Sequence, residues 1–97
     1  MIMKTPVFRV VSQGVVTYVP STKEDSGQLA KCVIRLKELG GKYENEYACT
    51  LFGNSALGKF YEGEVVMAAL RFQVHESNGN LYQDVTVKDI LKLNNSF

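Results

Sequence analysis

Apolar and polar residues alternate along most of this chain, and a two-residue period is typical of β-strands. β-Branched residues are frequent in the alternating runs, which strengthens that interpretation. The first run has Gly14 near its middle, where we expect a bulge or a bend. Five strands are predicted in all, over about 7–19, 29–39, 43–52, 64–76 and 81–87, with the last running on to 93.

Turn-forming residues separate these runs. The polar segment 20–27 predicts a turn, Gly40-Gly41 ends the second run, and Ser77-Asn78-Gly79-Asn80 predicts a tight hairpin. Between the third and fourth runs, Asn54-Ser55 predicts the cap of a short helix over 56–61. The apolar residues of that helix fall at helical spacing: Leu57, Phe60 and Tyr61.

The order of elements predicts an all-β fold. Three strands, a short helix and two further strands are the arrangement of a five-stranded OB-fold Greek-key barrel, with the helix between strands 3 and 4. An SH3-like barrel and a small sandwich are the alternatives, but neither accounts as well for the helix. With 97 residues the chain supplies one domain. We expect a single domain over 1–97, with its core over about 7–93 and a frayed tail at 94–97.

Alternation also predicts which side chains are buried. On the second and third strands the inward residues are Cys32, Ile34, Leu36, Tyr47, Cys49 and Leu51. On the fourth strand we expect Leu70 and Phe72 in the core. In the first half of that strand the other face is apolar too, and cover by a second subunit is its simplest explanation. We therefore expect a homodimer or homotetramer whose contact includes Val65, Met67 and Ala69.

Charge and cysteine content restrict the class of protein. The formal net charge is only +1, which argues against a purely electrostatic nucleic-acid binder, so any basic surface has to be local. Cys32 and Cys49 lie in apolar runs, and we expect buried free thiols. No apolar run approaches the roughly 20 residues of a membrane helix, and the N-terminus lacks the apolar centre of a signal peptide. We expect a cytoplasmic protein that does not bind membranes.

Several short motifs follow one another in a specific order. The third strand reads Glu-Tyr-Ala-Cys-Thr-Leu-Phe-Gly over 46–53, the helix ends at Glu62-Gly63, and the hairpin is followed by Tyr82 and by valines at 85 and 87. From about Phe8 to Leu93 the chain resembles bacterial single-stranded DNA-binding proteins and their short primosomal relatives. It departs from the replicative members, because it has no tryptophan, has Glu46 where they place one, and ends without their acidic tip. The resemblance implies an accessory replication, recombination or mobile-element protein.

Binding a single strand requires cations for the phosphates and aromatic rings for the bases, each stacked base contributing roughly 1–3 kcal/mol. In the family that the chain resembles, the aromatic residue matching Phe52 contacts DNA. Outward alternation and the loop between strands 2 and 3 supply the candidate residues Lys31, Arg35, Lys37, Tyr43, Phe52, Arg71 and His75. For the cations the alternative is a solvated strand face, for Phe52 core packing, and for His75 simple exposure. If the hairpin turns at Asn78-Gly79, Tyr82 faces His75.

Catalytic chemistry is not indicated. Both cysteines alternate inward, away from the single histidine, and Glu44 and Glu46 are expected to be solubilising charge. We expect no enzyme activity, no cofactor and no metal. The predicted partner is single-stranded DNA, with RNA as an alternative. Two other functions stay open: an OB module that docks a replication or conjugation protein, and binding of an oligosaccharide or other ligand.

Overall fold

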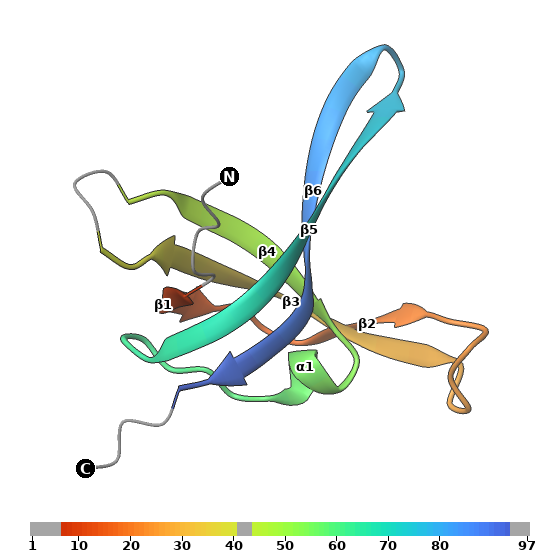
Figure 1. Ribbon diagram of the computed structural model, residues 1–97. Coiled ribbons are helices and arrows are strands. Elements are labelled where there is room, and N and C mark those ends of the chain that lie inside the picture. The colour runs from red at the N-terminus through yellow and green to blue at the C-terminus, as the bar shows by residue number, and fades with distance from the viewer. Residues whose placement is uncertain (1–6, 41–43, 94–97) are drawn as a thin grey trace.

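The computed structural model describes residues 7–40 and 44–93, and this part of the chain is mostly β with one short helix (Figure 1). Its elements are β1 (Val7–Gln13), β2 (Thr17–Pro20), β3 (Gln28–Glu38), β4 (Glu46–Phe52), α1 (Asn54–Leu57), β5 (Val65–Ser77) and β6 (Asn80–Lys92). The predicted tail at 94–97 lies outside the described residues.

The strands belong to one sheet whose pairing closes into a ring. The strand order is β1-β5-β6-β4-β3-β2, and β1 also pairs with β3. Pairing therefore runs from β1 through β5, β6, β4 and β3 back to β1. The contacts are antiparallel except between β4 and β6, which meet in parallel at Thr50 and Thr86. β2 is not part of the ring; it pairs antiparallel with the first four residues of β3.

The first predicted strand is bent at Gly14, as expected. β1 ends at Gln13 and β2 begins at Thr17. The backbone N–H of Gly14 donates to the carbonyl oxygen of Val33 at 2.7 Å. A Cβ atom at position 14 would lie 3.3 Å from that same oxygen. The close approach of the two backbones explains why glycine occupies this position.

The core lies inside the ring and follows the predicted alternation on β3 and β4. Ile34, Leu36, Cys49 and Leu51 are fully buried, and Cys32 is nearly so. Both cysteines are free thiols. Tyr47 is partly buried against the core, with its ring edge-on to Phe8 at a centroid distance of 6.0 Å. Burying each large aliphatic side chain contributes roughly 1.5–3 kcal/mol, so this cluster is the main source of stability.

One core prediction on the fourth strand is wrong. Leu70 packs against the core, but Phe72 is 50% exposed. Beyond the Arg71–Thr86 pair, β5 and β6 pair only with each other. We call this part of the hairpin, residues 72–85, the arm; Figure 1 shows it projecting from the rest of the molecule. Phe72 lies on the side of the strand that continues the core, where the ring of Tyr47 on β4 meets it edge-on at a centroid distance of 6.0 Å and leaves half of the side chain exposed.

The helix is shorter than predicted and begins earlier. α1 ends at Leu57 because Gly58 is in an extended conformation, with φ −68° and ψ 150°. Its N-cap is Gly53, without a side-chain hydrogen bond, and not Asn54-Ser55. The next residues bind the side chain of Gln13 instead of continuing the helix. Gln13 donates from Nε2 to the Gly58 oxygen at 2.8 Å, and its Oε1 accepts from the Phe60 N–H at 2.8 Å.

Nothing helical within residues 7–40 and 44–93 has the length and apolar character required to cross a bilayer.

Candidate nucleic-acid interface

The outward side chains of β3 and β4 form one continuous surface. Residues directly opposite each other on neighbouring strands point to the same side of a sheet. The outward pairs are Lys31–Phe52, Val33–Thr50, Arg35–Ala48 and Lys37–Glu46. Arg35, Lys37 and Phe52 therefore share a side, as the strand alternation predicts.

This surface continues across β6 to β5. Thr50 is paired with Thr86, and Thr86 is paired with Arg71. Val33 belongs to the same row, so four strands contribute neighbouring side chains. His75 lies on the same side of β5 as Arg71 because it is four residues further along. We call this outward side of β3, β4, β6 and the outer half of β5 the outer face.

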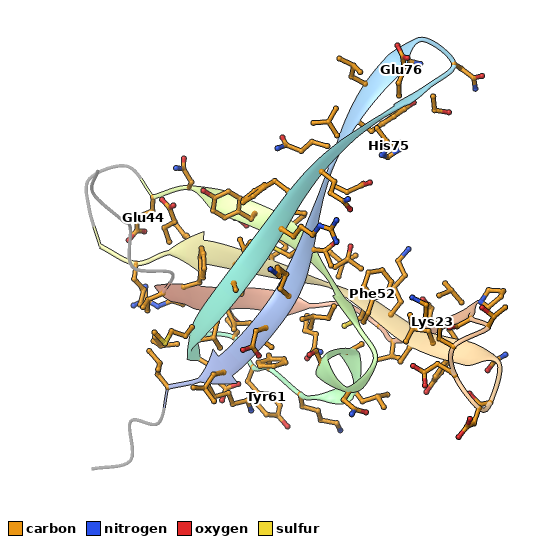
Figure 2. The ribbon with its side chains drawn as sticks, turned by 45° about the vertical axis from the view of Figure 1, so that its right-hand side comes forward. Lys23, Glu44, Phe52, Tyr61, His75 and Glu76 are labelled. Carbon is orange, nitrogen blue, oxygen red and sulfur yellow. The ribbon has the colours of Figure 1, made fainter. Side chains whose placement is uncertain are left out.

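Six of the seven predicted site residues thus lie on the outer face. The exception is Tyr43, which lies outside the described residues. Figure 2 places Phe52 on the body of the molecule and His75 on the arm. The candidate residues therefore spread over a long surface and do not converge on one pocket.

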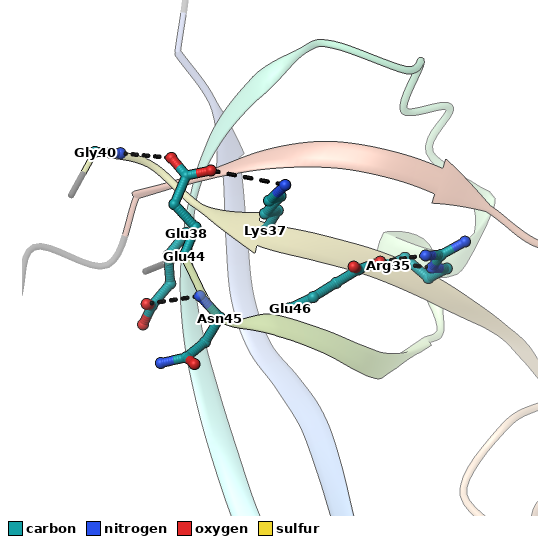
Figure 3. A network of polar contacts seen from close by, with 7 residues as sticks. All are labelled: Arg35, Lys37, Glu38, Gly40, Glu44, Asn45 and Glu46. Atoms are coloured by element: carbon teal, nitrogen blue, oxygen red, sulfur yellow. Dashed lines mark hydrogen bonds and ion pairs between the residues drawn. The ribbon is translucent and has the colours of Figure 1, made fainter. Parts of the chain in front are cut away.

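Two of the outer-face cations are already paired with acids (Figure 3). The Nε of Arg35 donates to Glu46 at 2.8 Å, and its guanidinium makes a salt bridge to the same carboxylate. Lys37 lies 3.7 Å from a carboxylate oxygen of Glu44. The other oxygen of Glu44 accepts from the backbone N–H of Gly40 at 3.1 Å, which fixes its position. Glu44 and Glu46 are more than the solubilising charges that the sequence predicts.

The other two of the four predicted cations, Lys31 and Arg71, have no acidic partner within the described part of the chain. Lys31 is half-buried opposite Phe52, and Arg71 is exposed at the base of the arm. Their charges are therefore available to an anion from solution. The side chains between them, at Val33, Thr50 and Thr86, are uncharged.

Aromatic rings flank this uncharged row: Phe52 is two residues from Thr50 on β4, and His75 is four residues from Arg71 on β5. Phe52 is 38% exposed, so the outward orientation is the one that the structure supports. On the arm, His75 is opposite Tyr82 and stacks on it, with ring centroids 5.3 Å apart and an interplanar angle of 23°. The imidazole Nδ1 lies 2.9 Å from a carboxylate oxygen of Asp84.

Tyr82 is a further candidate residue, which strand alternation alone does not single out. The signal was the two-residue turn at Asn78-Gly79, where both residues have positive φ angles of 52° and 80°. Such a turn fixes the register of the hairpin and brings Tyr82 opposite His75. The predicted pairing of these two residues is confirmed.

An apolar surface lies on the outward side of the first part of β5, over residues 65–69. Met67 is 39% exposed and stands opposite Leu91, which is 63% exposed. Val65 is half-buried and Ala69 is exposed on the same side. We call Val65, Met67, Ala69 and Leu91 the β5–β6 patch. All three residues predicted for a subunit contact thus point outward.

The described residues offer little for redox or metal chemistry. Among them, no group of three or more His, Cys, Asp or Glu side chains is arranged to hold a metal ion. Burial raises the pKa of the Cys49 thiol to about 11, so it is not a thiolate at neutral pH.

No protein-family model and no curated protein matches this chain. The functional assignment therefore depends on the arrangement of its own residues.

Proposed function

We propose that the ring of strands is an OB-fold barrel and that the protein binds single-stranded DNA on its outer face. The order of pairing supports the fold. If β1 and β2 count as one bent strand, the ring reads 1-2-3-5-4 and returns to strand 1, with a helix between strands 3 and 4. A five-stranded Greek-key barrel of this kind binds oligonucleotides on its strands and loops.

The observation that carries the proposed function is the placement of cations and aromatic rings on one surface. Lys31 stands beside Phe52, and Arg71 lies on the side of β5 that carries His75. Stacking is tolerant of base identity because every base has a π-face, and cations follow the phosphates. This combination suits a strand bound without sequence preference, and it needs no large net charge.

The proposed role is that of an accessory replication, recombination or mobile-element protein, acting in the cytoplasm as a homodimer or homotetramer. Two buried free thiols fit a reducing compartment. The β5–β6 patch is the proposed subunit contact. It would leave the outer face open to the nucleic acid in every subunit.

Titration with labelled oligo-dT tests this function. At about 50 mM salt the wild-type protein should bind, and log affinity should fall linearly with log salt concentration. Phe52→Ala should weaken binding by roughly 5- to 150-fold, which corresponds to the loss of one stacked base. A parallel titration with oligo-rU compares RNA with DNA.

Phe72→Ala is the matched control, because Phe72 is also exposed but points to the other side of β5. It should leave oligo-dT affinity within about twofold. Absence of any binding by the wild-type protein at 50 mM salt would refute the proposed function. Unchanged oligo-dT affinity after charge reversal at Arg71 and Lys31 together would show that these two cations do not contact the phosphates.

Docking of another protein is the second candidate, and the exposed apolar side of the arm favours it. Phe72, Val74 and Leu81 are between 50% and 72% exposed on that side. An OB module that recruits a replication or conjugation protein would use such a surface. Failure to bind oligo-dT, together with recovery of a protein partner that Val74→Asp abolishes, would support this function.

A further inference from the structure

The outer face carries two kinds of cation, and the difference bears on where a strand would lie. Arg35 and Lys37 are each held by a carboxylate, whereas Lys31 and Arg71 have no acidic partner among the described residues. A phosphate near Arg35 or Lys37 would also meet the negative charge of Glu46 or Glu44. The paired end of the face is therefore close to neutral, and the unpaired part is positive.

Each unpaired cation shares the outer face with an exposed ring. Lys31 is directly opposite Phe52, so their Cβ atoms are about 4.5–5.5 Å apart. Arg71 precedes His75 by four residues, or about 13 Å of strand, on the same side of β5. Near the paired cations, by contrast, β4 presents Ala48 and Glu46 outward, and neither has a ring.

Neutral side chains lie between the Lys31–Phe52 pair and Arg71. The row from Val33 to Arg71 crosses three strand spacings, or about 14 Å. Thr50 and Thr86 occupy the middle of that row and carry no charge that would repel a phosphate. On the arm, Asp84 stands opposite Gln73, between Arg71 and the His75–Tyr82 stack, and its carboxylate lies 2.9 Å from Nδ1 of His75, so this end of the row carries one acid as well as Arg71.

We propose that a bound strand follows a track from Lys31 and Phe52, across Thr50 and Thr86, to Arg71 and the His75–Tyr82 stack. Glu44 and Glu46 keep Lys37 and Arg35 out of the phosphate contacts. Tyr82 is then a second base-stacking residue. This inference rests on the proposed function and narrows it. It excludes Arg35 and Lys37 from the binding site and adds the ring of Tyr82.

The salt dependence of oligo-dT binding tests the track. Each phosphate contact on a single strand contributes about 0.7 to the slope of log affinity against log salt. Lys31→Ala and Arg71→Ala should each reduce the steepness of that slope by about 0.7. Glu46→Gln should make the slope steeper by about the same amount, because it frees Arg35. Tyr82→Leu should weaken binding at least about fivefold and leave the slope unchanged.

Charge-neutral double variants are the controls. Arg35→Ala with Glu46→Ala, and Lys37→Ala with Glu44→Ala, remove each ion pair without changing net charge. Both should keep the affinity within about twofold and the slope unchanged. All substituted side chains are exposed or half-buried, and urea unfolding of each variant checks that the fold is kept.

The outcomes separate the track from the function. If the wild-type protein binds and the double variants lose affinity and slope while Lys31→Ala and Arg71→Ala do not, the track is wrong and the function stands. If the wild-type protein does not bind oligo-dT at all, both fail. Loss of slope on removal of Lys31 or Arg71 alone supports the track.

Discussion

Cys49 is the residue whose titration is most clearly altered by folding. Its side chain is fully buried, and burial raises the pKa of its thiol from 9.0 to about 11. The thiol is therefore protonated in the folded protein at a pH where the unfolded chain has already lost that proton. This group contributes full stability below pH 9, and the contribution is lost as the pH rises towards 11.

We predict that the free energy of unfolding falls by about 2 kcal/mol between about pH 8 and pH 10.5 because of Cys49 alone. Urea unfolding of wild-type protein and Cys49→Ala at both pH values measures it. The variant is less stable at both, since it leaves a cavity, but its decrease with pH should be smaller by that amount. An equal decrease in both proteins would contradict the prediction.

At the residue scale, sequence alternation predicts the side to which a side chain points but not its partner. Arg35, Lys37 and Phe52 were placed on one side correctly, because that requires only the two-residue period. The ion pairs of Arg35 and Lys37 depend on which residues of β4 stand opposite, and the chain does not specify that register locally. For the same reason, strand alternation predicts Glu44 and Glu46 only as solubilising charges and does not predict their ion pairs.

The arm is the element on which alternation fails most clearly. Phe72 and Val74 continue the inward pattern of Val66 and Ala68, yet they are 50% and 65% exposed. Burial on a strand needs a neighbouring element of sufficient length, and β4 pairs with β6 only at Thr50. The helix shows a related limit. Its end is set by Gly58 and by Gln13, a residue 45 positions away from Gly58.

We predict that the arm opens independently of the rest of the sheet. A two-stranded hairpin without a packed face is marginally stable in water, so amide hydrogens within 72–85 should exchange at least about tenfold faster than those of β3. Gly79→Ala should increase exchange in the arm by a further 5- to 30-fold or so, because φ at this position is 80° and an L side chain there costs about 1–2 kcal/mol. Hydrogen-exchange mass spectrometry measures both effects.

Gly63→Ala is the control for the arm. Gly63 has a similarly positive φ of 90°, with nothing within 4 Å of an added Cβ atom, but it lies before β5 and donates its N–H to the carbonyl of Val10 at 2.8 Å. Gly63→Ala should therefore speed amide exchange in the strands of the ring and not in the arm. If Gly79→Ala lowers the protection of β3 as much as that of the arm, the arm does not open by itself.

At the scale of the whole molecule, the chain is more extended than its length requires. Its radius of gyration is 14.8 Å, whereas a compact domain of this size has about 12–13 Å. The arm and the β2–β3 hairpin both project from the ring (Figure 1). Local patterns predict the order of the strands, and they predict the number except that the first predicted strand is divided into β1 and β2. A ring of strands is implied by the predicted barrel, but no local pattern indicates the parallel contact of β4 and β6 that completes it, because that contact joins residues distant in sequence.

The last prediction concerns association through the β5–β6 patch. Met67 stands between Val7 on β1 and Leu91 on β6, so a charge at its position would lie at the centre of the patch. If the patch is the subunit contact, the wild-type protein sediments as a dimer or tetramer, and Met67→Asp shifts it to the mass of a monomer at equal concentration. The cause is the cost of burying an unpaired carboxylate in an apolar contact.

Leu81→Asp is the matched control, because Leu81 is also exposed and apolar but lies on the arm. It should leave the sedimenting mass unchanged. If this variant dissociates and Met67→Asp does not, the subunit contact lies on the arm. Oligo-dT affinity read on the same samples adds a second test. Met67 is not part of the track, which reaches β5 at Arg71, four residues further along the same side of the strand. The monomeric variant should therefore still bind a short oligo-dT. A wild-type protein that is monomeric at all concentrations would refute the subunit contact. The oligo-dT titrations would still test single-strand binding by the outer face independently.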